Sequence, residues 1–554
     1  MGFARDRHAA GRCSAWLVLA RRFLLCPACC LLFWYLPVAL AQASPSRWEA
    51  LSDTVFQHLG RSNGLPHQVV TSMAEDGAGF VWMGTQGGLA RWDGYRFKVF
   101  QPDTTRPGSL TDNNILSLYT DSDGRLWVAT LVGLARYDAA NDQFVALNLR
   151  QNRVSVYAML DDGQGGLWVG TRDGLQHLGR DGRLLSEDAD LGELAREGIH
   201  ALLREPDGRL WVGARNGLWY RNGHRGPFQR LLLQQQRPSF VLSLHRSSDG
   251  RLWVGTNGTG AYLVDPKKMT AQALLGHDSD TAGLNNLVIN AIHEIGNGEV
   301  WLGSSNYGVV AVEASSMRMR RMRHEVSLSS SVSEDGITSF LRDRSGLVWV
   351  GTYRGVSRYD PRQSRILSIF GNPLRPGRLA DTDVASIRAM PDGSLWVGLR
   401  SKGVNIISPE RHIKWLASDP DHPETALPSG PVRGFSLPIA GWVYFATNRG
   451  LYRSDVKGGH LQRVNTTRRD PAAAVVSMLQ QGERLWLGGV DGIWLIDFSK
   501  GEPLQAQRVP GSEALNKQLV MVIEQDRHGH LWLGTRDSGV NRFDSKLGLL
   551  TTIH

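Results

Sequence analysis

The chain has 554 residues, a formal net charge of +9 at pH 7 and four cysteines. Because all four cysteines lie within the first 30 residues, the rest of the chain can form no disulfide, zinc–thiolate site or cysteine nucleophile. Without residues 1–41, which hold five arginines and one aspartate, the charge would be +5, so charge alone does not indicate a nucleic-acid-binding protein.

The N-terminus has the features of an export signal. Arginines precede the apolar run Phe23–Leu36. The small residues that a signal peptidase needs follow at Ala39–Ala41 and Ala41–Ala43. We therefore expect residues 1–41 to be a cleaved signal peptide and the rest of the chain to be periplasmic. An uncleaved anchor helix over Phe23–Ala43, about long enough to span a bilayer, is the alternative.

One motif recurs through the rest of the chain. Most copies read Leu-Trp-Val-Gly-Thr or a close variant, followed by a second glycine and an apolar residue. The central aromatic residues are spaced by 41 to 48 residues, as expected for successive four-stranded blades of a β-propeller. These eleven residues are Trp82, Trp127, Trp168, Trp211, Trp253, Trp301, Trp349, Trp396, Tyr444, Trp486 and Trp532.

Each copy can be divided into four short strands, and the second copy shows the pattern clearly. Ile115–Tyr119 alternates as an inner strand, and Asp121–Gly124 is a tight turn whose glycine tolerates positive φ. Leu126–Val128, Leu134–Tyr137 and Gln143–Leu147 are then the second, third and outer strands. The sequence predicts an all-β fold, a β-propeller with eleven repeats.

The conserved spacing within the motif has a structural explanation. The tryptophan is a large apolar plug for the wedge between adjacent blades. The glycine two residues later lets the neighbouring sheet approach closely. We therefore interpret the motif residues as structural, and look for function in the loops.

The segments Leu167–Leu175 and Leu252–Thr256 resemble the two-component regulator propeller repeat. The resemblance covers residues 55–554, and Phe56–Leu59 followed by Gly64–Pro66 resembles the usual first segment of such sensors. It implies the periplasmic sensor region of a hybrid histidine kinase or of a propeller-type diguanylate cyclase. Members typically have two seven-bladed rings, an immunoglobulin-like domain, a membrane helix and a cytoplasmic output module.

Eleven blades depart from that pattern. Because propellers usually have four to eight blades, we expect one seven-bladed ring over residues 42–370. Four blades of an incomplete second ring would follow over residues 371–554. The sequence contains no output kinase or cyclase motif, so we expect a fragment of a longer receptor without its own output domain.

The loops between the second and third strands are the candidate ligand-binding regions. Six of the eleven contain an arginine, and all should open on one side of their ring, where several guanidinium groups could bind an anionic ligand. We expect a small extracellular ligand, with an acidic oligosaccharide as the specific hypothesis. The alternative is that arginine is simply a common solvated turn residue. The candidate residues are Arg172, Arg215, Tyr307, Tyr353, Arg354, Arg400, Arg449 and Arg536.

No catalytic constellation is recognisable in the sequence, so we predict a binding protein without cofactor or metal rather than an enzyme. The turn at Asp121 and Asp123 lacks the further ligands of a calcium loop. We expect no nucleic-acid partner and, from the resemblance, a homodimer. A free exported propeller lyase, a carbohydrate-binding protein and a protein-interaction platform are the alternatives. Histidines expected to be ordinary strand or loop residues are His177, His200, His245 and His293.

Overall fold

The computed structural model describes Trp48 and residues 53–553, with gaps at 152, 186–187, 224, 235–238, 277–280, 297, 363–366, 373–376, 420, 423–425, 465–473, 502–503 and 545. The predicted signal peptide lies outside the described residues. Two units are distinguished, Met1–Leu51 and Ser52–His554, and everything below concerns the second. Its described part forms eleven antiparallel sheets, here numbered blades 1 to 11 in chain order.

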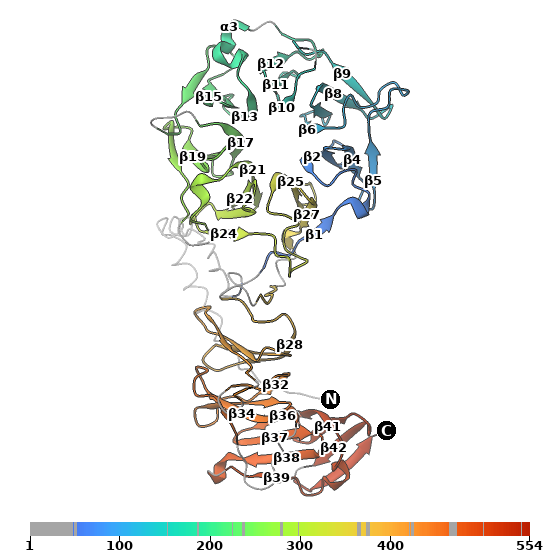
Figure 1. Cartoon of the computed structure of the whole chain (residues 1–554), viewed down its shortest axis with the longest axis vertical. Helices are drawn as coiled ribbons and strands as arrows, with labels where there is room; N and C mark the ends of the chain where they lie inside the picture. Colours follow the sequence, from blue (N-terminus) through green and yellow to red (C-terminus); the bar gives the residue numbers. More distant parts are fainter. Residues whose placement is uncertain are drawn as a thin grey trace, which may run out of the picture. The chain divides into compact units, whose positions relative to one another are not determined.

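Seven sheets surround a common axis (Figure 1). Blade 1 is formed by β2 (Val70–Glu75), β3 (Val81–Thr85), β4 (Gly88–Trp92) and β5 (Phe97–Phe100). Blade 2 is formed by β6 (Ile115–Thr120), β7 (Leu126–Thr130), β8 (Gly133–Asp138) and β9 (Gln143–Leu147). Blade 3 is formed by β10 (Val156–Asp161), β11 (Leu167–Thr171) and β12 (Gly174–Leu178). Blades 4 and 5 are formed by β13 (Ile199–Arg204), β14 (Leu210–Ala214), β15 (Gly217–Arg221) and β16 (Gln229–Leu231); and β17 (Val241–Arg246), β18 (Leu252–Thr256), β19 (Ala261–Asp265) and β20 (Thr270–Ala273). Blades 6 and 7 are formed by β21 (Ile289–Gly296), β22 (Glu299–Ser304), β23 (Val309–Glu313) and β24 (Met319–Met322); and β25 (Ile337–Arg342), β26 (Val348–Thr352), β27 (Gly355–Tyr359) and β1 (Gln57–Leu59).

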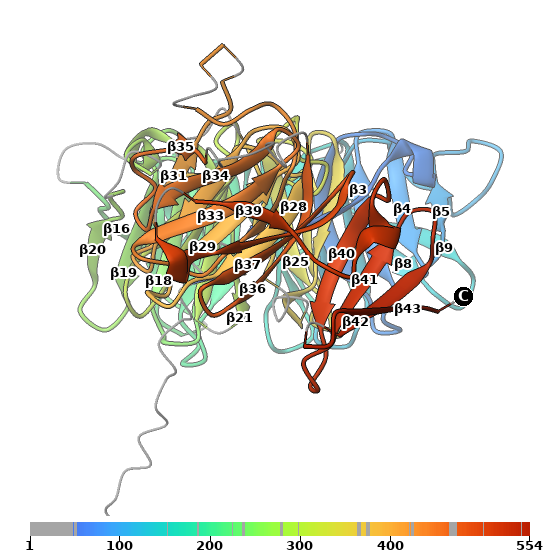
Figure 2. The ribbon, with the colours of Figure 1, turned by 90° about the horizontal axis from the view of Figure 1, so that it is seen from below.

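Four further sheets follow in the chain and stack on one another (Figure 2). Blades 8 and 9 are formed by β28 (Val384–Ala389), β29 (Leu395–Leu399), β30 (Val404–Ile407) and β31 (Ile413–Leu416); and β32 (Val432–Phe435), β33 (Trp442–Thr447), β34 (Gly450–Asp455) and β35 (Gln462–Arg463). Blades 10 and 11 are formed by β36 (Val475–Gln481), β37 (Arg484–Gly489), β38 (Gly492–Asp497) and β39 (Ala506–Arg508); and β40 (Val520–Gln525), β41 (Leu531–Thr535), β42 (Val540–Asp544) and β43 (Leu549–Ile553). The helical elements of the described residues are the short α3 (Asp188–Leu191) and the 3-10 turns Arg61–Asn63, Gly192–Ala195, Leu284–Asn286, Phe498–Lys500 and Glu513–Leu515.

Blades 1 to 7 form a closed cycle of contacts. Each inner strand contacts the next, from β2 through β25, and β25 contacts β2 again. Across this last junction the Arg344 backbone N–H donates to Glu75, and the Arg344 guanidinium donates to the carbonyls of Gly77 and Asp76 at 3.0 and 2.6 Å. The division of the chain into propeller domains at residue 370 stays a prediction.

Two blades depart from the predicted order of four consecutive strands. Blade 7 takes its outer strand from the start of the fold, since β1 pairs with β27 with Gln57 opposite Arg358. Phe56, just before β1, is buried against Trp301 and Tyr359 at ring-centroid distances of 6.1 and 6.0 Å. Blade 3 has three described strands, and only an isolated bridge from Leu178 to Leu184 takes the place of an outer one.

Every inner strand carries a β-bulge between its first and third residues. The first residue is valine or isoleucine, and at most junctions it packs onto the motif glycine of the preceding blade; Ala129 and Ala446 take the place of that glycine in blades 2 and 9. A Cβ atom placed on Gly303 would lie only 2.6 Å from Cγ2 of Ile337, and one on Gly84 would lie 2.6 Å from Cγ2 of Ile115. The predicted role of the motif glycine as a site of close approach is thus confirmed.

The motif tryptophans fill the spaces between blades, as predicted. Trp82 of blade 1 is fully buried among residues of blade 2, with its ring centroid 4.7 Å from that of Tyr137. A partner absent from the sequence analysis fixes its orientation, because the indole N–H donates to the Asp76 carboxylate at 2.7 Å. In three other blades the indole N–H of the motif tryptophan donates in the same way to an aspartate six residues earlier in the chain. These pairs are Trp127 with Asp121, Trp349 with Asp343, and Trp532 with Asp526.

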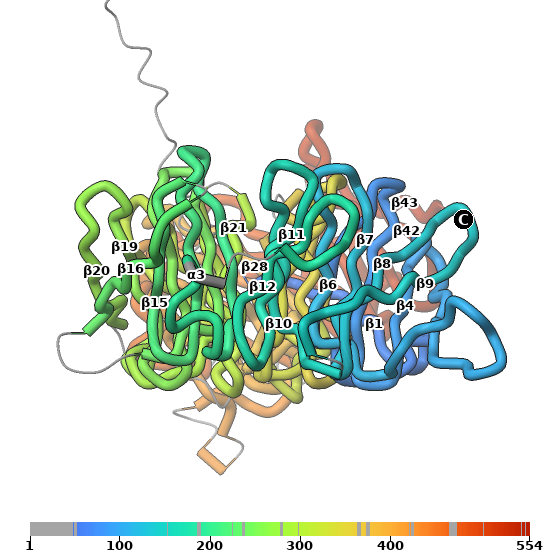
Figure 3. The backbone as a smooth tube through the Cα atoms, turned by 90° about the horizontal axis from the view of Figure 1, so that it is seen from above, coloured from blue at the N-terminus to red at the C-terminus, as the bar shows by residue number. Residues whose placement is uncertain are grey.

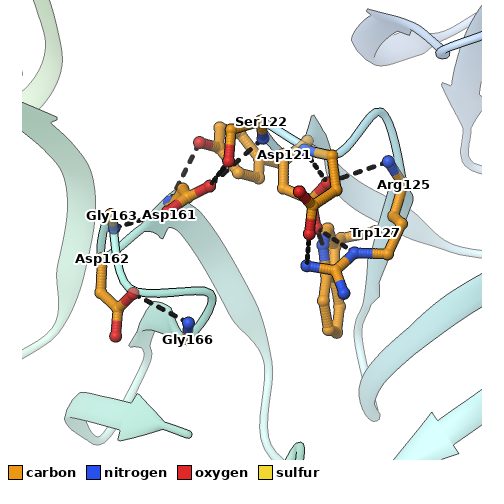
Figure 4. A network of polar contacts seen from close by, with 10 residues as sticks. Asp121, Ser122, Arg125, Trp127, Asp161, Asp162, Gly163 and Gly166 are labelled. Carbon is orange, nitrogen blue, oxygen red and sulfur yellow. Dashed lines mark hydrogen bonds and ion pairs between the residues drawn. The ribbon is translucent and has the colours of Figure 1, made fainter. Parts of the chain in front are cut away.

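The same aspartate also stabilises the turn before the tryptophan, as Figure 4 shows for Asp121. The Asp121 carboxylate accepts hydrogen bonds from the backbone N–H groups of Asp123 and Arg125 at 3.1 and 2.9 Å. Ser122 in the same turn donates both its N–H and its hydroxyl to Asp161 of blade 3. The acidic turn residues therefore cap a turn, hold the tryptophan and link two blades.

We expect Gly303→Ala to lower the free energy of unfolding by about 1–3 kcal/mol, because the new methyl group would overpack the contact with Ile337. Chemical denaturation of the purified chain measures the loss. Gly60→Ala is the control, since Gly60 has an extended backbone and no atom within 4 Å of an added Cβ. Equal stabilities of the two variants would contradict the close-approach role.

Phe56→Ala should cost about 3–5 kcal/mol, the usual range for a buried phenylalanine. Because Phe56 lies between blades 6 and 7, protease cleavage should begin in the β1 segment of this variant. Limited proteolysis with N-terminal sequencing tests this. Tyr95→Ala, at a residue 93% exposed, is the control and should leave the cleavage pattern unchanged.

Candidate functional site

The loops between second and third strands all open on one side of blades 1 to 7, here called the loop face. Antiparallel pairing requires this, because each such loop lies at the same end of its blade as the start of the inner strand. The backbone trace shows β10, β11 and β12 as successive neighbouring strands of blade 3 (Figure 3). Hydrogen bonds confirm it, since Arg172 N–H donates to the Ser155 carbonyl and Arg215 N–H to the Gly198 carbonyl, both at 3.0 Å.

Five of the predicted site residues lie on the loop face of blades 1 to 7: Arg172, Arg215, Tyr307, Tyr353 and Arg354. Arg172 and Arg215 belong to the adjacent blades 3 and 4, and both are exposed. The Arg172 guanidinium lies 3.7 Å from the Asp173 carboxylate in a surface ion pair, which contributes little to stability. Both side chains are thus accessible to an anion in solution.

The two predicted tyrosines already have neighbours. The Arg321 guanidinium lies over the Tyr307 ring at 3.4 Å from its centroid, a cation–π contact that covers one ring face. The Tyr353 ring packs against Gly336, where an added Cβ would lie 2.1 Å from the ring. Tyr353 is still 44% exposed, and Arg354 beside it is exposed as well.

The remaining predicted residues, Arg400, Arg449 and Arg536, lie in the same kind of loop in blades 8, 9 and 11. Arg400 is paired with Asp383 at 2.9 Å, and Arg536 with Asp537 at 3.2 Å. These three residues belong to a different set of blades from the other five, and the eight residues do not form one cluster.

The sequence analysis missed a row of aromatic rings beside Arg215. The Tyr157 and His200 rings, both at the second residue of an inner strand, stack with centroids 4.5 Å apart and planes 13° apart. Phe240, just before β17, meets the other side of His200 edge-on at 4.7 Å. Three successive blades, 3 to 5, therefore present adjoining half-buried rings at the loop face.

The Arg215 guanidinium lies close enough to His200 to affect its pKa. A Cβ placed on Gly198 would lie 3.5 Å from His200 Nε2 and 3.8 Å from Arg215 Nε, so the two side chains share one small region. Burial lowers the pKa of His200 to about 4, and the positive charge of Arg215 contributes. His200 is therefore neutral at pH 7, and its buried Nε2 has no hydrogen-bond partner.

Other inner strands use the second position differently. In blades 1, 6 and 7 the residue is Thr71, Asn290 or Thr338, and its side chain donates to the first backbone carbonyl of the next blade. Tyr157 and His200 replace that structural hydrogen bond by ring stacking. The second position of blades 3 and 4 thus differs in chemistry from that of blades 1, 6 and 7.

A surface cavity of about 680 Å³ lies further out on the same face, between blades 3 and 4. Charged residues of both signs line it, among them Arg150, Asp173, Glu193 and Arg196. Asp173 is also the ion-pair partner of Arg172, so the cavity begins beside the predicted arginine.

The other histidine pair lies at the opposite ends of the inner strands. The His245 and His293 rings are 5.2 Å apart, and His245 Nε2 accepts from the Glu294 backbone N–H at 3.0 Å. Burial lowers the pKa of His293 to about 4. Among the described residues there is no group of three His, Cys, Asp or Glu side chains that could hold a metal ion.

A search of the described residues also finds no helix long and apolar enough to cross a membrane.

Comparison with known proteins identifies the repeat. The two component regulator propeller model matches residues 64–87, 109–131, 148–173, 235–258 and 331–354. No curated protein sequence matches the chain significantly.

Solved structures show the same fold. The extracellular domain of the hybrid two component system BT3049 from B. thetaiotaomicron superposes with a TM-score of 0.74 at 20% identity, over 91% of this chain and 67% of that chain. A second extracellular domain, of BT4673 from B. thetaiotaomicron, gives 0.48 at 20% identity over 90% and 67% of the two chains. Virginiamycin B lyase from Staphylococcus aureus gives 0.44 at 13% identity over 55% and 99%. The last two TM-scores are too low to support a functional comparison.

The lowered pKa of His200 predicts a pH dependence of stability. Between pH 6.5 and about 4 the unfolded chain binds a proton that folded His200 does not, so its contribution to stability falls as the pH drops through this window. We expect a loss on the order of 1–3 kcal/mol. His200→Phe should remove this part of the slope while keeping a ring in the stack. Urea unfolding at pH 7 and pH 5 measures it.

His412→Phe, at an exposed residue of blade 8, is the matched control and should leave the slope unchanged. A wild-type slope in the His200 variant would show that His200 is solvated.

Proposed function

We propose that this chain, whose blades carry the two component regulator propeller repeat, is an extracellular sensor region that binds a small anionic ligand for a signal-transduction receptor. The observation that carries the proposal is the site at blades 3 to 5, where an exposed arginine adjoins a row of aromatic rings. The chain itself would act as a binding module in the periplasm, and an output module would supply the enzymatic step.

The chemistry of the site favours an acidic oligosaccharide. Carboxylates and sulfates accept paired hydrogen bonds from a guanidinium, which Arg172 and Arg215 could both supply. Sugar rings pack their apolar faces on aromatic side chains, and Tyr157 and Phe240 stand on either side of His200 for that contact. Neutral His200 adds no second positive charge to the site.

Signal transfer would follow from the placement of the site over three blades. A ligand that contacts Tyr157, His200 and Phe240 bridges the inner strands of blades 3 and 4 and the segment entering blade 5. Such a ligand favours whichever arrangement of these blades fits it best, and it can shift the receptor only by that difference in affinity. Paired receptors would then change their relative arrangement across the membrane.

Binding of uronic-acid di- and trisaccharides, measured by isothermal titration calorimetry beside neutral sugars of the same length, tests the proposal. We expect Arg215→Ala and Tyr157→Ala each to weaken binding about tenfold or more, equivalent to ~1.4 kcal/mol. Higher salt should weaken the wild-type interaction, since the contacts are charged and exposed.

Arg536→Ala is the matched control, an arginine in the same kind of loop in blade 11. It should bind like the wild type. Equal binding of neutral and acidic sugars would contradict the anionic ligand, and binding unaffected by Arg215→Ala would contradict this site.

A further inference from the structure

Blade 3 ends differently from blade 2, and a cavity lies where the two blades meet. In blade 2 the outer strand β9 follows the third strand, whereas in blade 3 a short turn over residues 179–183 follows β12. The Gly179 N–H donates to the Arg183 carbonyl at 2.8 Å within this turn. The cavity has a volume of about 470 Å³ and lies between the turn and β9. Small organic ligands occupy cavities of this size.

The cavity combines an apolar floor with a cationic rim. The floor consists of side chains from the hydrophobic cluster between blades 2 and 3, namely Trp127, Leu147, Leu149 and Leu184. The charged residues that line the cavity are four arginines and one aspartate: Arg125, Arg136, Arg180, Arg183 and Asp181. Figure 4 shows Arg125 and Trp127 on blade 2 and Gly166, which also lines the cavity, on blade 3. The excess of positive charge favours an anion.

Two of the four arginines already have acidic partners, and two do not. Arg125 pairs with two aspartates of its own turn at 2.7 and 2.9 Å. Arg183 lies 3.6 Å from Asp181. Arg136 and Arg180 form no ion pair with any other residue that the structure describes. Their guanidinium groups are therefore available to a bound anion.

The junction between blades 1 and 2 shows why Arg136 lacks a partner. Arg91 occupies the same position in blade 1, opposite the motif tryptophan, and donates to the Tyr137 hydroxyl of blade 2 at 3.3 Å. Tyr137 donates in turn to Asp142 at 2.7 Å. In blade 3 the residue equivalent to Tyr137 is Leu178, whose side chain can form no hydrogen bond. The repeat thus keeps its arginine here but has lost the group that binds it.

The neighbours of the two unpaired arginines complete the site. The aliphatic part of Arg180 packs on Gly165, since an added Cβ there would lie 3.3 Å from Cγ and Cδ of Arg180. Val145 of β9 is the cross-strand neighbour of Arg136 and is 46% exposed. An uncovered apolar side chain therefore lies directly beside an unpaired cation.

We propose that this cavity binds a small organic carboxylate with an apolar body, as a ligand additional to that of the loop face. Arg136 and Arg180 donate hydrogen bonds to its carboxylate group. The apolar floor removes its body from water. The described residues that line the cavity include none from a loop between a second and a third strand, so the two sites can be occupied independently.

Isothermal titration calorimetry of the full chain with 2-naphthoate tests the proposal. We expect saturable binding at one site per chain. Binding should be about tenfold weaker or more for 2-naphthamide, which has the same body without the charge, and for acetate, which has the charge without the body. Arg136→Gln and Arg180→Gln should each weaken naphthoate binding about tenfold. Arg542→Gln, at the same repeat position in blade 11, is the matched control and should bind like the wild type.

A carboxylate supplied by the chain itself provides a second test. Val145→Glu places one across the sheet from Arg136, where it competes with the ligand, and should weaken naphthoate binding about tenfold. Val145→Gln has the same size without the charge and should keep most of the binding. Because Val145 is half-exposed, both variants should keep the circular dichroism spectrum and melting temperature of the wild type.

Three outcomes would overturn the proposal. One is the absence of saturable naphthoate binding, or binding no tighter than that of naphthamide or acetate. Another is equal binding by Arg136→Gln, Arg180→Gln and the wild type. The third is loss of binding in Arg215→Ala with full binding in Arg136→Gln, because the probe would then occupy the loop face. We expect Arg215→Ala to bind naphthoate like the wild type, so a failure of this site is distinguishable from a failure of the proposed function.

Discussion

The packing of one branched side chain against one glycine is the contact on which this fold depends. Ile115 against Gly84 and Ile337 against Gly303 are examples, and in both inner strands the branched residue lies at the start of the β-bulge. The contact leaves no space for a methyl group at the glycine. Consequently the angle and separation of successive blades are fixed by backbone atoms, and the larger side chains only fill the space that remains.

The same contact determines the place of the second residue of each inner strand. The residue after the branched one lies in the bulge, next to the following blade, and in blades 1, 6 and 7 its side chain donates a hydrogen bond to that blade. Stability requires only that some side chain satisfies or covers the neighbouring backbone. In blades 3 and 4 the corresponding residues, Tyr157 and His200, stack on each other instead. In the function proposed above, a position that carries a hydrogen bond between blades elsewhere would contribute to ligand binding here.

The sequence predicted the strands of one blade well, since the observed β6 to β9 agree with the expected segments to within two residues at each end. It also predicted the roles of the motif glycine and tryptophan, because both depend on repetition along the chain. The row Tyr157, His200 and Phe240 could not be predicted, because these rings meet only through the angle between blades. The outer strand of blade 7 was missed because the local sequence pattern predicts where strands occur and does not predict which strands pair.

Because β1 pairs with β27, the order in which the chain is synthesised affects how the ring closes. Gln57 leaves the ribosome about 300 residues before Arg358, its partner in the last blade of the closed cycle. The entropic cost of closing such a long loop grows only slowly with its length, but contacts so distant in sequence form late. Until then the first strand waits with unpaired backbone groups and an uncovered phenylalanine, which are the features that invite aggregation. A chaperone that shields the earliest segment of the nascent chain would therefore influence the yield of closed rings more than one acting on any later blade.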